Sequence, residues 1–189
     1  EDEFHQNARA YVQQAARVVS FDGGNPVEVL YNGDWLNKLT LSEILKILDH
    51  FTLAQISERD LFEERRKRGQ EVNMREALYP ILQAYDSVAM NIDLEVGGTD
   101  QTFNMLAGRS LMKTMQNRNK LVMTTPLLTD AKGMKIGKTE GNVIGITDAP
   151  VDLFGKIMAL PDEITAKAFE YLTDMPMQEV QEISKSIEK

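Results

Sequence analysis

The sequence predicts an α/β fold in which a parallel sheet is followed by a helical module. Strand-like residues 93–96, helix-like residues 102–115 and the extended run 120–129 follow one another at the spacing of a βαβ unit. From about Asp148 onward the pattern is helical without strands, and prolines separate the segments. With 189 residues, 42% of them hydrophobic, the chain can bury one large core or two small ones.

Three elements are predicted in the first part of the chain. Residues 3–18 are typical of a helix, and a Gly-Gly-Asn-Pro turn at 23–26 separates it from a strand-like run at 27–32. Thr40 and Glu43 have the spacing of a capping box, which predicts that a helix begins there.

The middle of the chain is predicted to be helical. Residues 58–69 carry many charges of both signs, which is typical of a solvated helix. Asn73 is placed to cap a helix over 74–90, in which Pro80 is expected to cause a bend. The apolar arc expected on this helix consists of Leu78, Leu82, Tyr85, Val88 and Ala89.

Composition excludes several classes of protein. The net charge of -8 argues against a protein that coats nucleic acid through bulk charge. Without cysteine there is no disulfide framework, thiolate metal site or cysteine nucleophile, and His5 and His50 lack metal-ligand spacing, so no metal site is predicted. No apolar run reaches the roughly 20 residues of a membrane helix, and we expect a cytoplasmic protein without a membrane partner.

The stretch EVGGTDQTFN, residues 95–104, lies between a predicted strand and a predicted helix. Ligands of open parallel sheets bind at such strand ends, where glycines such as Gly97 and Gly98 allow close approach and a helix start offers free N–H groups. Asp100 and Gln101 would project at the mouth of that site. The alternative is a purely structural Gly-Gly turn with a polar helix cap.

A second polar cluster is predicted on the helix over 74–90. Tyr79, Gln83 and Asp86 have i, i+4, i+7 spacing and share one stripe. Hydroxyl and amide groups can hold the α-amino end of an amino acid, while a carboxylate accepts from a donor on its side chain. The alternative is an ordinary solvated helix edge.

Residues 130–142, DAKGMKIGKTEGN, form a glycine-rich segment in which Lys135 and Lys138 flank Gly137 and precede Thr139. Two ammonium groups can stabilise the charge that develops on a triphosphate as pyrophosphate leaves. The spacing does not match the phosphate loop G-x-x-x-x-G-K-[ST]. A Lys-Gly surface turn is the alternative.

Three motifs together, LYPILQAYD, VGGTDQ and KIGKTEGN, resemble the class I aminoacyl-tRNA synthetases, and among them the bacterial-type tyrosyl-tRNA synthetases. The resemblance covers nearly the whole chain. It implies the second half of a Rossmann-like nucleotide-binding domain over 1–147, with a helical insertion at about 36–75, and the start of a helical domain over 148–189.

The resemblance also implies roles for individual residues. Lys135 and Lys138 occupy the mobile lysine signature and would be catalytic, and with Thr139 they would bind ATP. The substrate-binding residues would be Tyr79 and Gln83 at the tyrosine ammonium, Asp86 at the phenol hydroxyl, and Asp100 and Gln101 at the adenylate, together with Gly98.

The chain departs from the family pattern in two respects. Thr99, Thr102 and Phe103 differ from the usual GGSDQWGN, and no His-Ile-Gly-His segment is found. We therefore expect a fragment, the carboxyl-terminal part of a catalytic domain, that is inactive in isolation.

The implied activity is ATP-dependent activation of tyrosine, with Mg²⁺, followed by transfer to tRNA(Tyr) by a homodimer whose interface involves the insertion and Met74. One alternative is a tryptophanyl-tRNA synthetase, against which Gly97-Gly98 and Tyr85 argue. Another is a non-catalytic dimerisation module.

Overall fold

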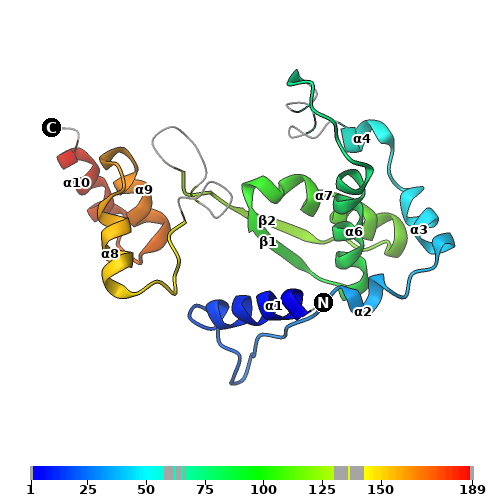
Figure 1. Cartoon of the computed structure of the whole chain (residues 1–189), viewed down its shortest axis with the longest axis horizontal. Helices are drawn as coiled ribbons and strands as arrows, with labels where there is room; N and C mark the ends of the chain where they lie inside the picture. Colours follow the sequence, from blue (N-terminus) through cyan, green and yellow to red (C-terminus); the bar gives the residue numbers. More distant parts are fainter. Residues whose placement is uncertain are drawn as a thin grey trace. The chain divides into compact units, whose positions relative to one another are not determined.

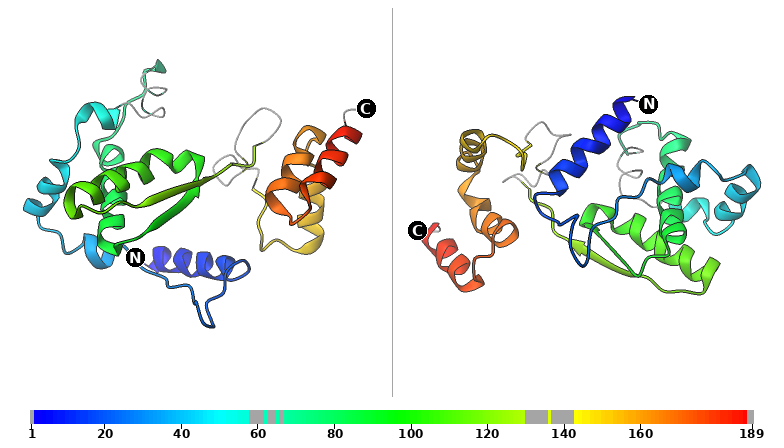
Figure 2. Two further views of the ribbon diagram at one scale, coloured as in Figure 1. Left: turned by 180° about the vertical axis from the view of Figure 1, so that it is seen from behind. Right: turned by 90° about the horizontal axis from the view of Figure 1, so that it is seen from below.

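The computed structural model describes residues 2–57, 62, 65, 67–129, 136 and 143–187. The chain divides into two compact units, coloured along the sequence in Figures 1 and 2. One unit is Tyr31–Pro126, and the other combines Glu1–Leu30 with Leu127–Lys189. Each unit has its own set of helices and is described by itself.

The unit Tyr31–Pro126 is built on a βαβ motif. Strand β1 (Leu94–Gly98) pairs in parallel with β2 (Leu121–Thr125), first residue opposite first and last opposite last. A short 3-10 turn, η1 (Thr99–Gln101), leads from β1 into helix α7 (Thr102–Gln116), which packs on both strands. The predicted strand, helix and parallel strand are confirmed.

Helix α6 (Met74–Met90) packs along α7 (Figure 1). Asn73 caps it as predicted, because its side chain accepts from the backbone N–H of Arg75 over 2.9 Å. The helix continues through Pro80. The predicted apolar arc is partly wrong, since Ala89 is exposed and the buried side holds Pro80, Ile81, Ala84, Ser87 and Val88. Small side chains on that side let α6 approach α7 closely.

The short helices α2 (Gly33–Leu36), α3 (Leu41–Leu48) and α4 (Leu53–Ser57) precede α6. The predicted capping box of α3 is present: Thr40 Oγ1 accepts from the Glu43 N–H, and Glu43 Oε2 accepts from the Thr40 N–H. The backbone N–H of Thr40, and its hydroxyl, which also donates to Glu43 Oε2, hold the pKa of Glu43 below its usual value. The core of this unit consists of Ile47, Ile56, Phe62, Ile81, Ala84, Val88, Ala107, Leu111 and Met112.

The predicted strand at 27–32 is wrong. Residues 27–31 form no strand, and their side chains are exposed. In the described part of the chain β1 and β2 pair only with each other. The alternating valines of this segment favour an extended chain, but a strand also needs a hydrogen-bonded neighbour.

The regular elements of the other unit, among its described residues, are helices. It contains α1 (Asp2–Ala15), α8 (Pro150–Met158), α9 (Asp162–Leu172) and α10 (Met177–Ile187), and α9 packs on α10. The predicted first helix and the three closing helices are therefore confirmed. None of the described helices combines the length and the hydropathy needed to cross a membrane.

Candidate active site

Several of the predicted site residues lie where β1 ends and α7 begins, or on α6, which packs along α7. Gln83 and Asp86 lie on α6, Gly98 is the last residue of β1, and Gln101 closes the η1 turn. The carboxyl end of a parallel strand followed by a helix start is the usual place for a ligand in an α/β protein.

Asp86 is held by two donors from the segment before α3. Its Oδ1 accepts from Trp35 Nε1 over 2.7 Å, and its Oδ2 accepts from Asn32 Nδ2 over 3.3 Å. Burial raises the pKa of this carboxyl above its usual value, against the lowering effect of the two hydrogen bonds, and the nearby Glu95 charge raises it further. Both oxygens thus have a fixed direction in a half-buried site.

Gln83 and Gln101 are joined through a buried asparagine. Asn104 Nδ2 donates to Gln83 Oε1 over 3.0 Å and to Gln101 Oε1 over 3.1 Å. Both glutamines therefore present their carbonyl oxygen to Asn104 and keep their NH₂ groups as donors for other partners. The Asn104 Oδ1 atom is buried and has no hydrogen-bond partner among the described residues.

Tyr79 and Asp100 lie at the periphery of this cluster. The Tyr79 side chain is 63% exposed, whereas those of Gln83 and Asp86 on the same helix are partly buried. Asp100 is exposed in η1, just before α7. Gly97 lies close to α7, because a Cβ there would come within 3.1 Å of Met105 Sδ.

Lys135, Lys138 and Thr139 lie outside the described residues. Among the residues that are described, no group of three His, Asp or Glu side chains is arranged to hold a metal ion.

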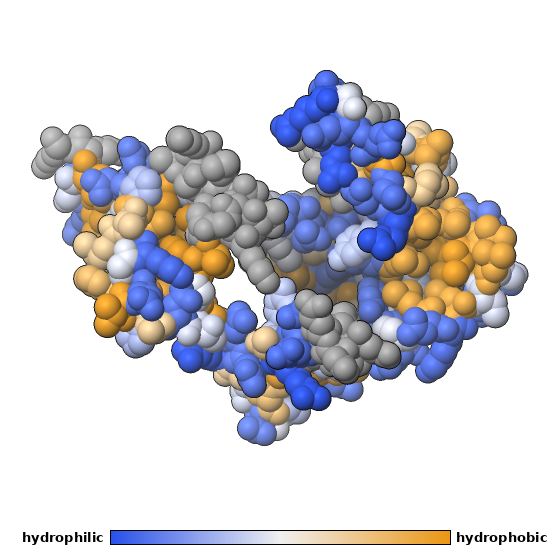
Figure 3. Space-filling view, viewed as in Figure 1, coloured by the Kyte–Doolittle hydropathy of each residue, from blue (hydrophilic) through white to orange (hydrophobic). Residues whose placement is uncertain are grey.

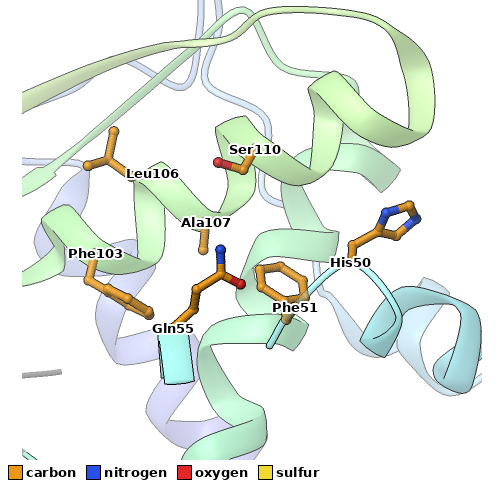
Figure 4. A pocket seen from close by; sticks show the side chains of 7 residues that line it. All are labelled: His50, Phe51, Gln55, Phe103, Leu106, Ala107 and Ser110. Atoms are coloured by element: carbon orange, nitrogen blue, oxygen red, sulfur yellow. The ribbon is translucent and has the colours of Figure 1, made fainter. Parts of the chain in front are cut away.

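An apolar cavity of about 190 Å³ lies between α4 and α7, away from these residues (Figure 4). The close-up shows Gln55 between Phe51 and Phe103, while His50 points away from the rings. Its lining consists of His50, Phe51, Gln55, Phe103, Leu106, Ala107 and Ser110, and includes no predicted site residue. We therefore place the candidate site at the polar cluster.

Sequence reasoning missed Asn32, Trp35 and Asn104. Asn32 and Trp35 lie more than 50 residues before Asp86, in a segment without a recognisable motif. Asn104 carried a usable signal, because it stands three residues after Gln101 on the predicted helix and so shares its face.

The chain matches the family described as tRNA synthetases class I (W and Y) over residues 1–189. A tyrosine–tRNA ligase of Burkholderia lata is 39% identical over 99% of this chain and 45% of its own length. A tyrosine–tRNA ligase of Thermotoga maritima is 37% identical over 100% of this chain and 46% of its own length. This chain thus spans about half the length of the curated relatives it matches.

Solved structures show the same fold. A truncated mitochondrial tyrosyl-tRNA synthetase of Coccidioides posadasii superposes with a TM-score of 0.58 and 24% identity, over 82% of this chain and 47% of its own. The tyrosyl-tRNA synthetase of Archaeoglobus fulgidus gives a TM-score of 0.59 and 22% identity, over 76% of this chain and 47% of its own. This likeness confirms the predicted Rossmann-like α/β fold class. The match over the whole length shows that the chain belongs to the class I tRNA synthetases, in the family of the tryptophan and tyrosine enzymes.

Proposed function

We propose that this chain is part of a tyrosyl-tRNA synthetase, which activates tyrosine with ATP and transfers it to tRNA(Tyr) in the cytoplasm. The supporting observation is the half-buried Asp86 carboxylate, oriented by Trp35 and Asn32. An oriented acceptor in a partly dry site suits the phenol hydroxyl of tyrosine, because phenylalanine would offer no donor to the remaining lone pairs of the carboxylate. The curated relatives at 37–39% identity are named tyrosine–tRNA ligases.

In the proposed reaction the tyrosine carboxylate attacks the α-phosphate of ATP and pyrophosphate leaves, without a covalent enzyme intermediate. Tyr79 and Gln83 would hold the tyrosine ammonium, with Gln83 Oε1 accepting through its second lone pair. Asp100 and Gln101 would face the adenylate, with Gly98 beside them. Lys135, Lys138 and Thr139 would bind ATP, and the two lysines would stabilise the leaving pyrophosphate.

Mg²⁺ would enter the reaction with ATP, bound to its phosphates. Residues 1–147 are proposed as part of the catalytic domain, with the insertion at 36–75, and 148–189 as the start of a helical domain. A full-length enzyme is here a protein that contains this chain and is as long as the relatives it matches.

The proposed function is tested by charging of tRNA(Tyr). Full-length enzyme should attach tyrosine to this tRNA and should not charge tRNA(Trp) with tryptophan. Charging of tRNA(Trp) would instead support the tryptophanyl alternative. A folded dimer that charges neither tRNA and forms no adenylate would support the other alternative, a non-catalytic dimerisation module.

Replacing Trp35 by phenylalanine should weaken tyrosine selection. The ring stays, but Asp86 Oδ1 loses its 2.7 Å hydrogen bond and with it a fixed direction. We expect kcat/KM for tyrosine to fall about tenfold or more, with little change for phenylalanine. Equal losses for both amino acids would mean that Trp35 serves the fold alone.

We also propose that the chain forms a homodimer through α3, α4 and the start of α6. Figure 3 shows hydrophobic side chains gathered over α3 and beside α4. Leu53 and Met74 are 77% and 69% exposed and line one apolar groove, and Leu41 and Leu45 on α3 are also exposed. A two-fold contact of about 800 Å² per partner would let this surface cover itself.

The double variant Leu53→Glu/Met74→Glu should dissociate this dimer. The two new carboxylates of each protomer would be buried against the same carboxylates of the other protomer. Because like charges repel, the dimer dissociation constant should rise about a hundredfold. Light scattering over a dilution series measures it, with Val151→Glu on α8 as control, since Val151 is 82% exposed outside the proposed surface. Wild type that stays monomeric and folded at roughly tens of micromolar would contradict the dimer.

A further inference from the structure

A buried lysine lies beneath the candidate site and has no part in the proposed reaction. Lys120, directly before β2, is 0% exposed. Its Nζ donates to Ser87 Oγ over 2.7 Å and forms an ion pair with Glu95 Oε2. Fully buried lysines are rare in proteins, and those that occur are usually paired with a carboxylate, as Lys120 is.

The ion pair leads directly to the proposed substrate residues. Ser87 Oγ donates to the same Glu95 oxygen over 3.3 Å, while the other oxygen of Glu95 accepts from Gln83 Nε2 over 3.5 Å. Gln83 in turn is bonded to Asn104, which bonds Gln101. A continuous polar chain thus runs from Lys120 to both glutamines.

The packing makes room for this ammonium. Gly108 lies in the middle of α7, where glycine costs helix stability relative to alanine. A Cβ at this position would come within 2.5 Å of Lys120 Nζ and 2.6 Å of Ser87 Oγ. A glycine at position 108 of α7 therefore leaves the space that the Lys120 ammonium occupies.

We propose that Lys120 is a positioning residue for tyrosine binding, which acts through Glu95 on Gln83. This inference rests on the proposed function. Without the ammonium, Glu95 would keep an uncompensated charge in a largely buried place and would draw on its remaining donors, among them Gln83.

The test is steady-state pyrophosphate exchange by full-length enzyme carrying Lys120→Met. The KM for tyrosine should rise about tenfold, while the KM for ATP stays within about threefold, because the proposed ATP ligands lie on another segment. The charge-balanced double variant Lys120→Met/Glu95→Gln should recover most of the tyrosine affinity. Lys113→Met, an exposed lysine on α7, is the matched control and should behave as wild type.

Three outcomes would overturn the proposal. The first is an unchanged tyrosine KM in Lys120→Met, the second is an equal rise in both KM values, and the third is a double variant no better than the single one. If Lys120→Met does not fold, Gly108→Ala tests the proposal in its place, because the added Cβ would meet Lys120 Nζ. Gly155→Ala is the control, since a Cβ at that glycine meets no other atom within 4 Å. Gly108→Ala should raise the tyrosine KM about fivefold, and an unchanged value overturns the proposal. Wild type without tyrosine-dependent exchange refutes the proposed function itself, and this inference with it.

Discussion

Asp86→Ala in the full-length enzyme should remove most of its preference for tyrosine over phenylalanine, by a factor of up to about 10⁴ to 10⁵. The carboxylate is half-buried and held by Trp35 and Asn32, so in complex with phenylalanine it would face a ring without a donor. That penalty disappears when the acceptor is removed. The measurement is kcat/KM for each amino acid by pyrophosphate exchange.

The matched control for this variant is Asp152→Ala. Asp152 is an exposed helical aspartate on α8, outside the candidate site, and its loss should leave the ratio of the two kcat/KM values unchanged. If Asp86→Ala keeps the wild-type ratio, Asp86 does not recognise the phenol hydroxyl.

Lys138→Ala should slow adenylate formation far more than it weakens tyrosine binding. The charge that Lys138 is proposed to meet develops as pyrophosphate leaves, so the interaction belongs to the transition state. Loss of one such group costs about 10² to 10³ in rate. Rapid quench under single-turnover conditions gives the rate, and equilibrium dialysis with labelled tyrosine should give an affinity within about threefold of wild type.

The exposed Lys113 provides the control for the lysine signature, because Lys113→Ala removes an equal charge from α7 at a distance in sequence from residues 130–142. Its single-turnover rate should match that of wild type. A Lys138→Ala enzyme with a normal rate but weakened tyrosine binding would assign Lys138 to recognition of the bound amino acid instead.

Local sequence signals predicted much of this fold. The caps at Thr40 and Asn73 and the βαβ unit were found because short-range spacing determines them. The strand predicted at 27–32 is wrong because a strand depends on a partner that local propensity does not report. The buried side of α6 was misjudged at Ala89, since tertiary packing decides which side faces α7.

The candidate site could be predicted only in part. Gln83, Asp86 and Gln101 were predicted from spacing and from the resemblance. The structure joins Gln83 to Gln101 through Asn104, and Asp86 lies further along α6. Trp35 and Lys120 were not found, because their contacts with Asp86 and Glu95 join residues far apart in the sequence. A buried lysine also has no sequence signature, since most lysines lie on the surface.

The central claim is that Asp86 recognises the hydroxyl of tyrosine, and a crystal structure of the full-length enzyme with bound tyrosine tests it most directly. We predict a carboxylate oxygen of Asp86 within about 3 Å of the phenol oxygen, with Trp35 Nε1 still donating to Asp86. Tyrosine bound elsewhere, for example in the apolar cavity beside Phe51 and Phe103, with Asp86 free of the ligand, would contradict this account.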